Sequence, residues 1–187
     1  RALKKHGHSF IVLLKKIGLM NERLQVVHAV HLTNEDKAIL AETNANVIHC
    51  PSSNLLLGSG ICPTKDLLEL GVNVALGTDG SASNNGIDLL SEAALAESLI
   101  KGIAQDASVY RASNALGMTT MNGARALGLE RRIGSLEVGK DADFVAFDTR
   151  HPAIEPMIDP FRSIISNSGA RCISYVYAKG KPLVENG

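Results

Sequence analysis

The sequence contains no tryptophan and few other aromatic residues. Aromatic residues make up 4% of the 187 residues, whereas 45% are hydrophobic, so we expect a core of mostly aliphatic side chains. An excess of charge of one sign is also lacking, because nineteen basic and nineteen acidic side chains cancel. Nucleic-acid binding normally requires a basic surface, and we therefore expect no nucleic-acid partner.

Long hydrophobic runs are missing as well. No apolar run approaches the length of a membrane-spanning helix, so we expect no membrane association. The apolar stretch Phe10–Leu14 is too short for the hydrophobic region of a signal peptide and is followed by two lysines. Three cysteines, at positions 50, 62 and 172, are too few for a disulfide framework in a chain of this size. These absences predict a protein of the reducing cytoplasm.

Residues 1–128 alternate between apolar strands and helices. Strands are expected at 24–30, 46–49 and 72–76, helices at 3–17, 33–43, 63–71 and 87–101, and shorter helical segments at 108–116 and 119–127. A polar loop is expected at 52–62. The strand starts are about 20 to 27 residues apart, a spacing typical of βα units. Strands this apolar are typical of a parallel sheet covered on both faces.

The pattern changes near Glu130. A turn-rich segment leads to strands at 144–147 and 172–177, and a tight turn at Gly180-Lys181 leads to a further strand at 182–184. Strands joined by tight turns are typical of β-hairpins rather than of βα units. The sequence therefore predicts two parts, an α/β layer in residues 1–128 and part of a small β module in residues 129–187.

Three polar side chains stand at the ends of the expected parallel strands. His28 and His49 end the first two strands, and Asp79 follows the third. Ligands bind at the carboxyl ends of parallel strands, and histidine and aspartate can serve there as metal ligands or as general acids and bases. Each residue alone also has a structural interpretation, as a hydrogen-bonded core histidine or a turn-forming aspartate. Their occurrence on successive strands favours a functional site.

The loops after these strands add neutral hydrogen-bonding groups, which suit an uncharged polar heterocycle better than a phosphate. They are Ser52, Ser53, Asn54, Ser81, Ser83, Asn84 and Asn85. No phosphate-binding glycine motif is present. His31 could line the pocket or cap the turn, and Cys50 and Cys62 are expected to be buried thiols rather than zinc ligands.

His6-Gly7-His8 has the spacing of a metal-binding pair. In a strand, residues i and i+2 face the same way and could reach one ion, but this pair follows Leu3-Lys4-Lys5 in an expected helix. On a helix the two imidazoles point apart. We therefore do not expect a metal site here.

The motifs Val26–Leu32, His49–Leu55 and Leu76–Asn84 together resemble the metal-dependent amidohydrolase superfamily. Within it they are most similar to the branch of 5-methylthioadenosine/S-adenosylhomocysteine deaminases and triazine chlorohydrolases. The segment Gly134–Val145 resembles the return of the chain into the small β domain of that family. The resemblance covers essentially the whole chain.

The resemblance implies a (β/α)8 TIM barrel with a β-sandwich, of which this chain holds strands six to eight with their helices and part of the sandwich. It implies that His28 is not a metal ligand and that it orients or helps to deprotonate the attacking water. It implies that Asp79 binds the metal and accepts the proton of that water. His31, Asn54, Ser83 and Asn84 are then candidates for substrate binding, and His49 lies behind them.

The implied cofactor is Zn2+, or alternatively Fe2+ or another divalent metal. The family takes its remaining metal ligands from an H-x-H pair on strand one and from a histidine of an H-x-x-E motif on strand five. No H-x-x-E motif occurs in this sequence, and His6-Gly7-His8 cannot replace the strand-one pair because it lies in the helix expected just before strand six. The expected partners are therefore the N-terminal half of the same protein, a small heterocyclic substrate and, as is common in the family, a second copy in a homodimer.

Three functions remain open. The first is hydrolytic deamination of a purine nucleoside such as 5-methylthioadenosine or S-adenosylhomocysteine, with release of ammonia. The second is amino- or chlorohydrolysis of a triazine, guanine or cytosine. The third belongs to another class, an inactive fragment or a non-catalytic binding protein without a metal site.

Overall fold

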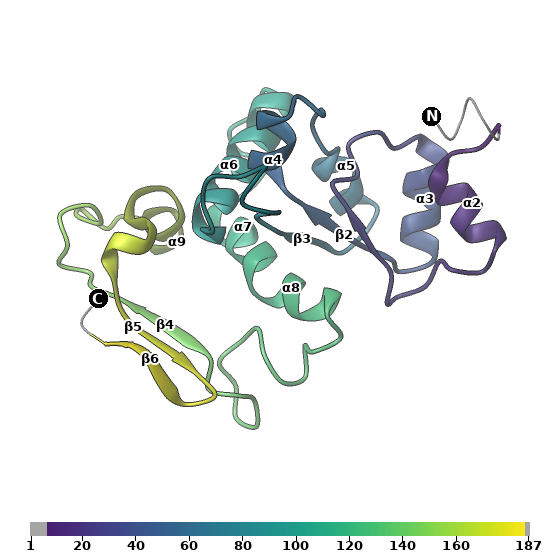
Figure 1. Ribbon diagram of the computed structural model, residues 1–187. Helices are drawn as coiled ribbons and strands as arrows, with labels where there is room; N and C mark the ends of the chain where they lie inside the picture. Colours follow the sequence, from purple (N-terminus) through teal and green to yellow (C-terminus); the bar gives the residue numbers. More distant parts are fainter. Residues whose placement is uncertain (1–6, 186–187) are drawn as a thin grey trace.

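The computed structural model describes residues 7–185, without the side chains of residues 167 and 168. Two separate three-stranded sheets organise this part of the chain (Figure 1). The first is parallel and consists of β1 (Gln25–Val27), β2 (Asn46–His49) and β3 (Val74–Leu76), in that order. The second is antiparallel and consists of β4 (Phe144–Phe147), β5 (Ile173–Ala178) and β6 (Lys181–Glu185).

Helices connect and cover the strands of the parallel sheet and lead on to the second sheet. They are α2 (Phe10–Lys16), α3 (Asn34–Glu42), α4 (Pro51–Leu56), α5 (Thr64–Glu69), α6 (Leu89–Ala104), α7 (Ala112–Thr119), α8 (Met121–Ala126) and α9 (Pro160–Arg162). A π-helical turn at Ser163–Ser168 and a 3-10 turn at Gly169–Cys172 complete the order.

The main core lies between the parallel sheet and the helices. Val47 and Val74 pair across β2 and β3, are fully buried, and share one apolar cluster with Leu40 of α3 and Leu67 of α5. On β1, by contrast, Val27 is 48% exposed. The described strand β1 pairs only with β2, which leaves its other edge open. The predicted cover on both faces of the sheet is thus present for β2 and β3 and incomplete for β1.

The first helix and the first strand are shorter than the sequence predicts. The helix expected at 3–17 begins at Phe10, because the Ser9 hydroxyl accepts a hydrogen bond from the Val12 amide and caps it; residues 3–6 lie outside the described residues. The strand expected at 24–30 ends at Val27. His28 and Ala29 adopt left-handed backbone conformations, with φ of 70° and 51°, which no strand can contain.

The expected loop at 52–62 is wrong in its first part. Residues Pro51–Leu56 form helix α4 directly after β2. Proline at the first helical position has the helical φ already fixed, and the amide it lacks would have no partner there. The polar Ser-Ser-Asn composition therefore conceals a helix, and this helix contacts α6.

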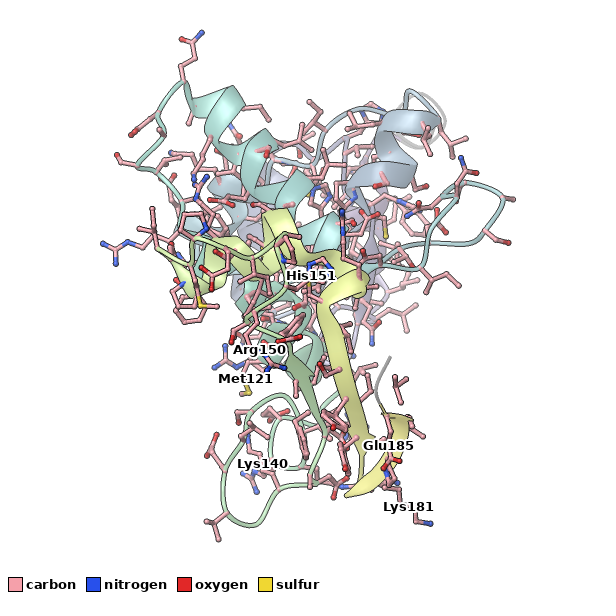
Figure 2. The ribbon with its side chains drawn as sticks, turned by 90° about the vertical axis from the view of Figure 1, so that its left-hand side faces the viewer. Met121, Lys140, Arg150, His151, Lys181 and Glu185 are labelled. Carbon is pink, nitrogen blue, oxygen red and sulfur yellow. The ribbon has the colours of Figure 1, made fainter. Side chains whose placement is uncertain are left out.

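The second sheet is a hairpin-based module, as predicted. Lys179 and Gly180 both have positive φ, 52° and 71°, so the tight turn lies one residue earlier than expected and matches the twist of the hairpin. Phe144 and Tyr177 stack across β4 and β5 with ring centroids 4.6 Å apart. Every residue of β6 is exposed, including Lys181 and Glu185 (Figure 2).

Several contacts attach this module to the α/β part, and Ile165 is buried in the main apolar cluster of the latter. At Gly134, an added Cβ would lie 2.8 Å from Ala124 Cβ and 3.0 Å from Met121 Sδ, so the turn packs tightly on α8. Arg162 Nη2 donates to Glu97 Oε1 of α6 at 3.1 Å. The boundary at residues 128/129 stays a prediction, because these contacts join the two parts without marking where either ends.

The described residues form no closed barrel; the parallel sheet stops at three strands. A search of the described helices for one long and apolar enough to cross a membrane finds none.

Candidate active site

The carboxyl ends of the parallel strands bring His28 and Asp79 together. His28 follows β1, Asp79 follows β3, and His28 Nε2 lies 3.9 Å from Asp79 Oδ2. Their side chains are 40% and 32% exposed, respectively, so both remain open to solvent or substrate. The convergence expected from the strand ends is therefore present.

Asp79 is held by three hydrogen bonds. Ser53 Oγ donates to Oδ2 at 2.6 Å, Ser83 Oγ donates to the same oxygen at 2.8 Å, and the Gly80 amide donates to Oδ1 at 2.8 Å. Hydrogen bonds to a carboxylate favour its charged form. Those from Ser53 and Ser83, followed by the one from Gly80, lower the pKa of Asp79 to about 2. Asp79 is consequently ionised at any pH at which the protein functions.

His28 is oriented by an amide. Its Nδ1 lies 2.9 Å from Asn54 Oδ1. An amide oxygen can only accept, so Nδ1 carries the proton of this hydrogen bond. In the neutral imidazole, Nε2 is then the lone-pair nitrogen, and it is the nitrogen nearer to Asp79. The arrangement presents a proton acceptor beside the carboxylate.

The backbone on both sides of this pair is left-handed. Positive φ occurs at His28, at Ala29 and at Asp79, where φ is 59°. Such conformations are rare for residues other than glycine and cluster at functional sites. They aim the two side chains across the sheet edge instead of along the strands.

The other predicted site residues divide into two groups. Asn54 and Ser83 contact His28 and Asp79 directly, as described above. His31 is exposed, and its Cε1 lies 3.8 Å from the position that a Cβ on Gly60 would occupy. Within the described part of the chain it forms no hydrogen bond with His28 or Asp79. Asn84 is 8% exposed, and its Nδ2 donates to Thr78 O and to Glu92 Oε1. Substrate binding by these four residues stays a prediction.

His49 is buried near His28. It lies on the same face of β2 as Val47 and lines a cavity of about 150 Å³ together with Cys62, Thr64 and Ile100. It is 1% exposed, and its Nδ1 has no hydrogen-bond partner among the described atoms. Burial, and then the nearby His28, lower the pKa of His49 to about 4, which keeps the ring neutral at physiological pH.

The fit of these side chains to a metal ion can be tested on their chemistry. Within residues 7–185, no three histidine, cysteine, aspartate or glutamate side chains are grouped to hold one ion. Asp79 nevertheless suits a single ligand, since it is ionised and its Oδ1 accepts only one hydrogen bond and keeps a free lone pair. The described residues therefore supply one candidate metal ligand, Asp79.

The three cysteines are buried free thiols, which confirms the prediction for Cys50 and Cys62. Burial, followed by the Asp79 and Glu92 carboxylates, raises the pKa of Cys50 to about 11. Burial also raises the pKa of Cys62 to about 11. Neither thiol has the lowered pKa that a nucleophile or a metal ligand needs.

Two contributors were missed from the sequence. Ser53 was grouped with the polar loop residues, and the hydrogen bond that it donates to Asp79 follows from α4, which the loop prediction hid. Glu92 lies on the buried face of α6 and is 2% exposed. A charged residue on the alanine-rich face of a predicted helix is the signal that could have found it.

Comparisons with known proteins agree with this geometry. The profile of the Amidohydrolase family matches residues 1–183. A 5-methylthioadenosine/S-adenosylhomocysteine deaminase of Moorella thermoacetica is 45% identical over 183 residues, which cover 98% of this chain and 43% of that protein. The chain thus spans less than half the length of the curated relatives that it matches.

Two solved structures extend the comparison. The crystal structure of an adenosine deaminase from Xanthomonas campestris, with bound zinc, superposes with a TM-score of 0.95 at 40% identity, covering 99% of this chain and 42% of that one. An atrazine chlorohydrolase from Arthrobacter aurescens, complexed with zinc, gives a TM-score of 0.92 at 28% identity, covering 99% and 41%. Family profile, sequence and structure lead to one conclusion: the chain belongs to the amidohydrolase family and carries the C-terminal part of its TIM-barrel-type fold.

Proposed function

We propose that the protein containing this chain hydrolyses the amino group of 5-methylthioadenosine or S-adenosylhomocysteine and releases ammonia. The observation that carries the proposal is the placement of His28 Nε2 at 3.9 Å from an ionised Asp79 at the strand ends. The names of relatives such as the Moorella thermoacetica deaminase supply the substrate class.

In the proposed fold, β1, β2 and β3 are strands six, seven and eight of the barrel. Their parallel order and the high TM-scores support this assignment. The remaining strands and metal ligands then come from the part of the protein upstream of Arg1. The fraction of each relative that this chain covers, about 42%, supports that view.

Proton handling falls to the residues of this chain. Asp79, held ionised by Ser53, Ser83 and Gly80, accepts a proton from the attacking water. His28 Nε2 offers a second acceptor beside Asp79, because Nδ1 is committed to Asn54 Oδ1. His28 can then hold the proton, and as an imidazolium it stabilises negative charge that develops on the substrate.

We assign Zn2+ as the metal, with Asp79 as one ligand and with Fe2+ or another divalent ion as the alternative. The zinc in the two related crystal structures supports this assignment. When bound, the ion supplies the Lewis acidity that lets water attack at neutral pH.

The substrate is a neutral, polar heterocycle in this proposal. Asn54, Ser83 and Asn84 bring uncharged hydrogen-bonding groups to the strand ends, and His31 would border the opening. We further propose a cytoplasmic homodimer, for which the three reduced, buried cysteines support the compartment.

The test uses the purified full-length protein, loaded with zinc. Ammonia release is measured for 5-methylthioadenosine, S-adenosylhomocysteine, adenosine and guanine, and chloride release is measured for a chlorotriazine. We expect the highest kcat/KM for one of the two thioether nucleosides. A higher kcat/KM for the triazine would favour the second candidate, which the atrazine chlorohydrolase likeness supports. A protein that binds no zinc under zinc-replete conditions and shows no turnover would favour the third candidate, a non-catalytic binding protein.

A further inference from the structure

Glu92 is a buried carboxylate with two hydrogen-bond donors directed at it. It lies in the first turn of α6 and is 2% exposed. Its Oε1 accepts from Asn84 Nδ2 at 2.7 Å, and its Oε2 accepts from the Ser52 amide at 3.1 Å. No ion pair with a cationic side chain is formed by Glu92 in the described part of the chain.

The two donors belong to different segments of the site. Asn84 ends the loop that follows β3 and carries Asp79, and it is joined to that loop by Nδ2 to Thr78 O at 2.9 Å and by its amide to Gly80 O at 3.0 Å. Ser52 lies in the first turn of α4, next to Ser53 and Asn54. One carboxylate thus connects the loop that bears Asp79 with the helix that bears the partners of Asp79 and His28.

We propose that Glu92 is a positioning residue that sets the spacing between these two segments and thereby the hydrogen bond from Ser53 to Asp79. As far as turnover is concerned, this inference rests on the proposed deaminase function. The contact itself can be tested without any substrate.

A carboxylate is the side chain that this place requires. Both neighbours are donors, and a carboxylate accepts on each of its two oxygens. Glutamine has the same length, but its NH2 group would face one of the donors and leave that donor without an acceptor. An unsatisfied buried donor is costly, so the segment that loses its bond is expected to loosen.

Glu97 offers a matched control on the same helix. It is 3% exposed, lies five residues further along α6, and its side chain pairs with Lys101 and with Arg162. Neither Lys101 nor Arg162 lies in the Asp79 loop or in α4. Glu97→Gln therefore removes a buried carboxylate from α6 without loosening either segment of the site.

The experiment compares Glu92→Gln and Glu97→Gln in the full-length, zinc-loaded protein. Hydrogen–deuterium exchange is measured for peptides spanning residues 51–57 and 78–86, together with Tm, bound zinc, kcat and KM. For Glu92→Gln we expect faster exchange in at least one of these peptides and a kcat lower by about 10- to 100-fold, with KM changed only a few-fold. For Glu97→Gln we expect a lower Tm, unchanged exchange in both peptides and a kcat within about twofold of the wild type. The reason is that the lost ion pairs lie outside both segments of the site, so the variant lowers stability and leaves the site geometry intact.

The proposal is overturned if exchange in both peptides is the same in Glu92→Gln as in the wild type, or if the two variants lower kcat equally. Exchange is read on the protein without substrate. Absence of deaminase turnover in the wild type would therefore refute the proposed function while leaving the Glu92 result to be read separately.

Discussion

The α/β part and the hairpin module differ in how many polar side chains they bury. Buried polar residues are frequent in the α/β part, where Asp36, Asn46, His49, Ser53, Asn54, Thr64, Asn84, Glu92 and Glu97 are all less than 9% exposed. In residues 129–185, Ser163 is the one buried polar residue of the side chains described. The module contacts the α/β part through close packing at Gly134, the ion pair of Arg162 with Glu97 and the burial of Ile165 in the main core. Figure 1 shows the chain passing from α8 to β4.

This difference separates the site from its support. Burying a polar group is unfavourable unless it is hydrogen-bonded, so its repeated occurrence beside the strand ends indicates a purpose other than stability. Ser53, Asn54 and Glu92 are examples, because each contacts a residue of the Asp79–His28 pair or a segment that carries it. Changes at residues that contact the Asp79–His28 pair or the segments that carry it should therefore alter chemistry, whereas changes at the module junction should alter stability alone.

The sharpest test of this division is Asp79→Asn in the full-length protein. Asparagine keeps the shape and tolerates the left-handed backbone at this position, but it is neutral and cannot accept a proton. We expect kcat/KM to fall by about 10³-fold and bound zinc to decrease, with Tm almost unchanged. Steady-state kinetics and metal analysis measure both effects.

Asp88→Asn is the matched control for this variant. Asp88 caps α6 through hydrogen bonds to the amides of Leu90 and Ser91, and asparagine caps a helix equally well. Activity should therefore be retained. Equal kinetics for Asp79→Asn and Asp88→Asn would remove Asp79 from the mechanism.

The second test uses pH and His49. The pKa of His49 is about 4 in the folded protein and near 6.5 when unfolded, so between these values the unfolded state binds more protons. The free energy of unfolding should fall by up to about 3 kcal/mol as the pH is lowered from 6.5 to 4. Urea unfolding at several pH values measures this slope, and His49→Leu should flatten it. A slope that His49→Leu leaves unchanged would contradict the prediction.

The third test breaks the junction. In Gly134→Ala, the new Cβ would lie 2.8 Å from Ala124 Cβ, on a backbone with φ of +93°. Gly139 has the same φ of +93° and nothing within 4 Å, so Gly139→Ala isolates the backbone contribution. We expect about 3 kcal/mol of destabilisation for Gly134→Ala and about 1 kcal/mol for Gly139→Ala. Both variants should keep the wild-type kcat below their Tm, and a large loss of kcat at Gly134 would undo the proposed separation.

The smallest expected effect is that of Asn54→Leu. This variant removes the acceptor for His28 Nδ1 and also the buried Nδ2 that has no partner, so the loss of stability should be small. Without the amide, the imidazole is free to change tautomer, and we expect kcat to fall about tenfold with little change in KM. Imidazole ¹⁵N shifts of His28 would report the change of tautomer. An unchanged tautomer would show that another group orients the ring.

Much of the fold follows from sequence because its signals are local. Apolar strands such as Val74–Leu76 and the N-cap at Thr33 are visible in the residues themselves. The end of β1 is not, since nothing in the composition of Val-His-Ala announces the left-handed turn at His28. Helix α4 was missed for a similar reason, because serine and asparagine usually favour turns and the contact of α4 with α6 overrides that preference.

The site shows the same limit. The approach of His28 to Asp79 follows from the rule that parallel strands end at one edge, so the sequence predicts it. Which hydroxyl or amide group then forms a hydrogen bond with His28 or Asp79 depends on side-chain rotamers and on the presence of helix α4. Asn54 and Asn84 illustrate this, because they look alike in sequence, yet one contacts His28 and the other contacts Glu92.

The left-handed backbone at His28, Ala29 and Asp79 has a consequence for mutational scanning and for engineering of this protein. At these three positions most replacements carry a steric penalty before any chemistry is lost, and β-branched residues carry the largest. In a library at position 79, most substitutions will therefore reduce stability, even for properties that do not depend on the charge of Asp79. Only glycine and asparagine report on chemistry alone there, and a scan of this region should be calibrated on those two.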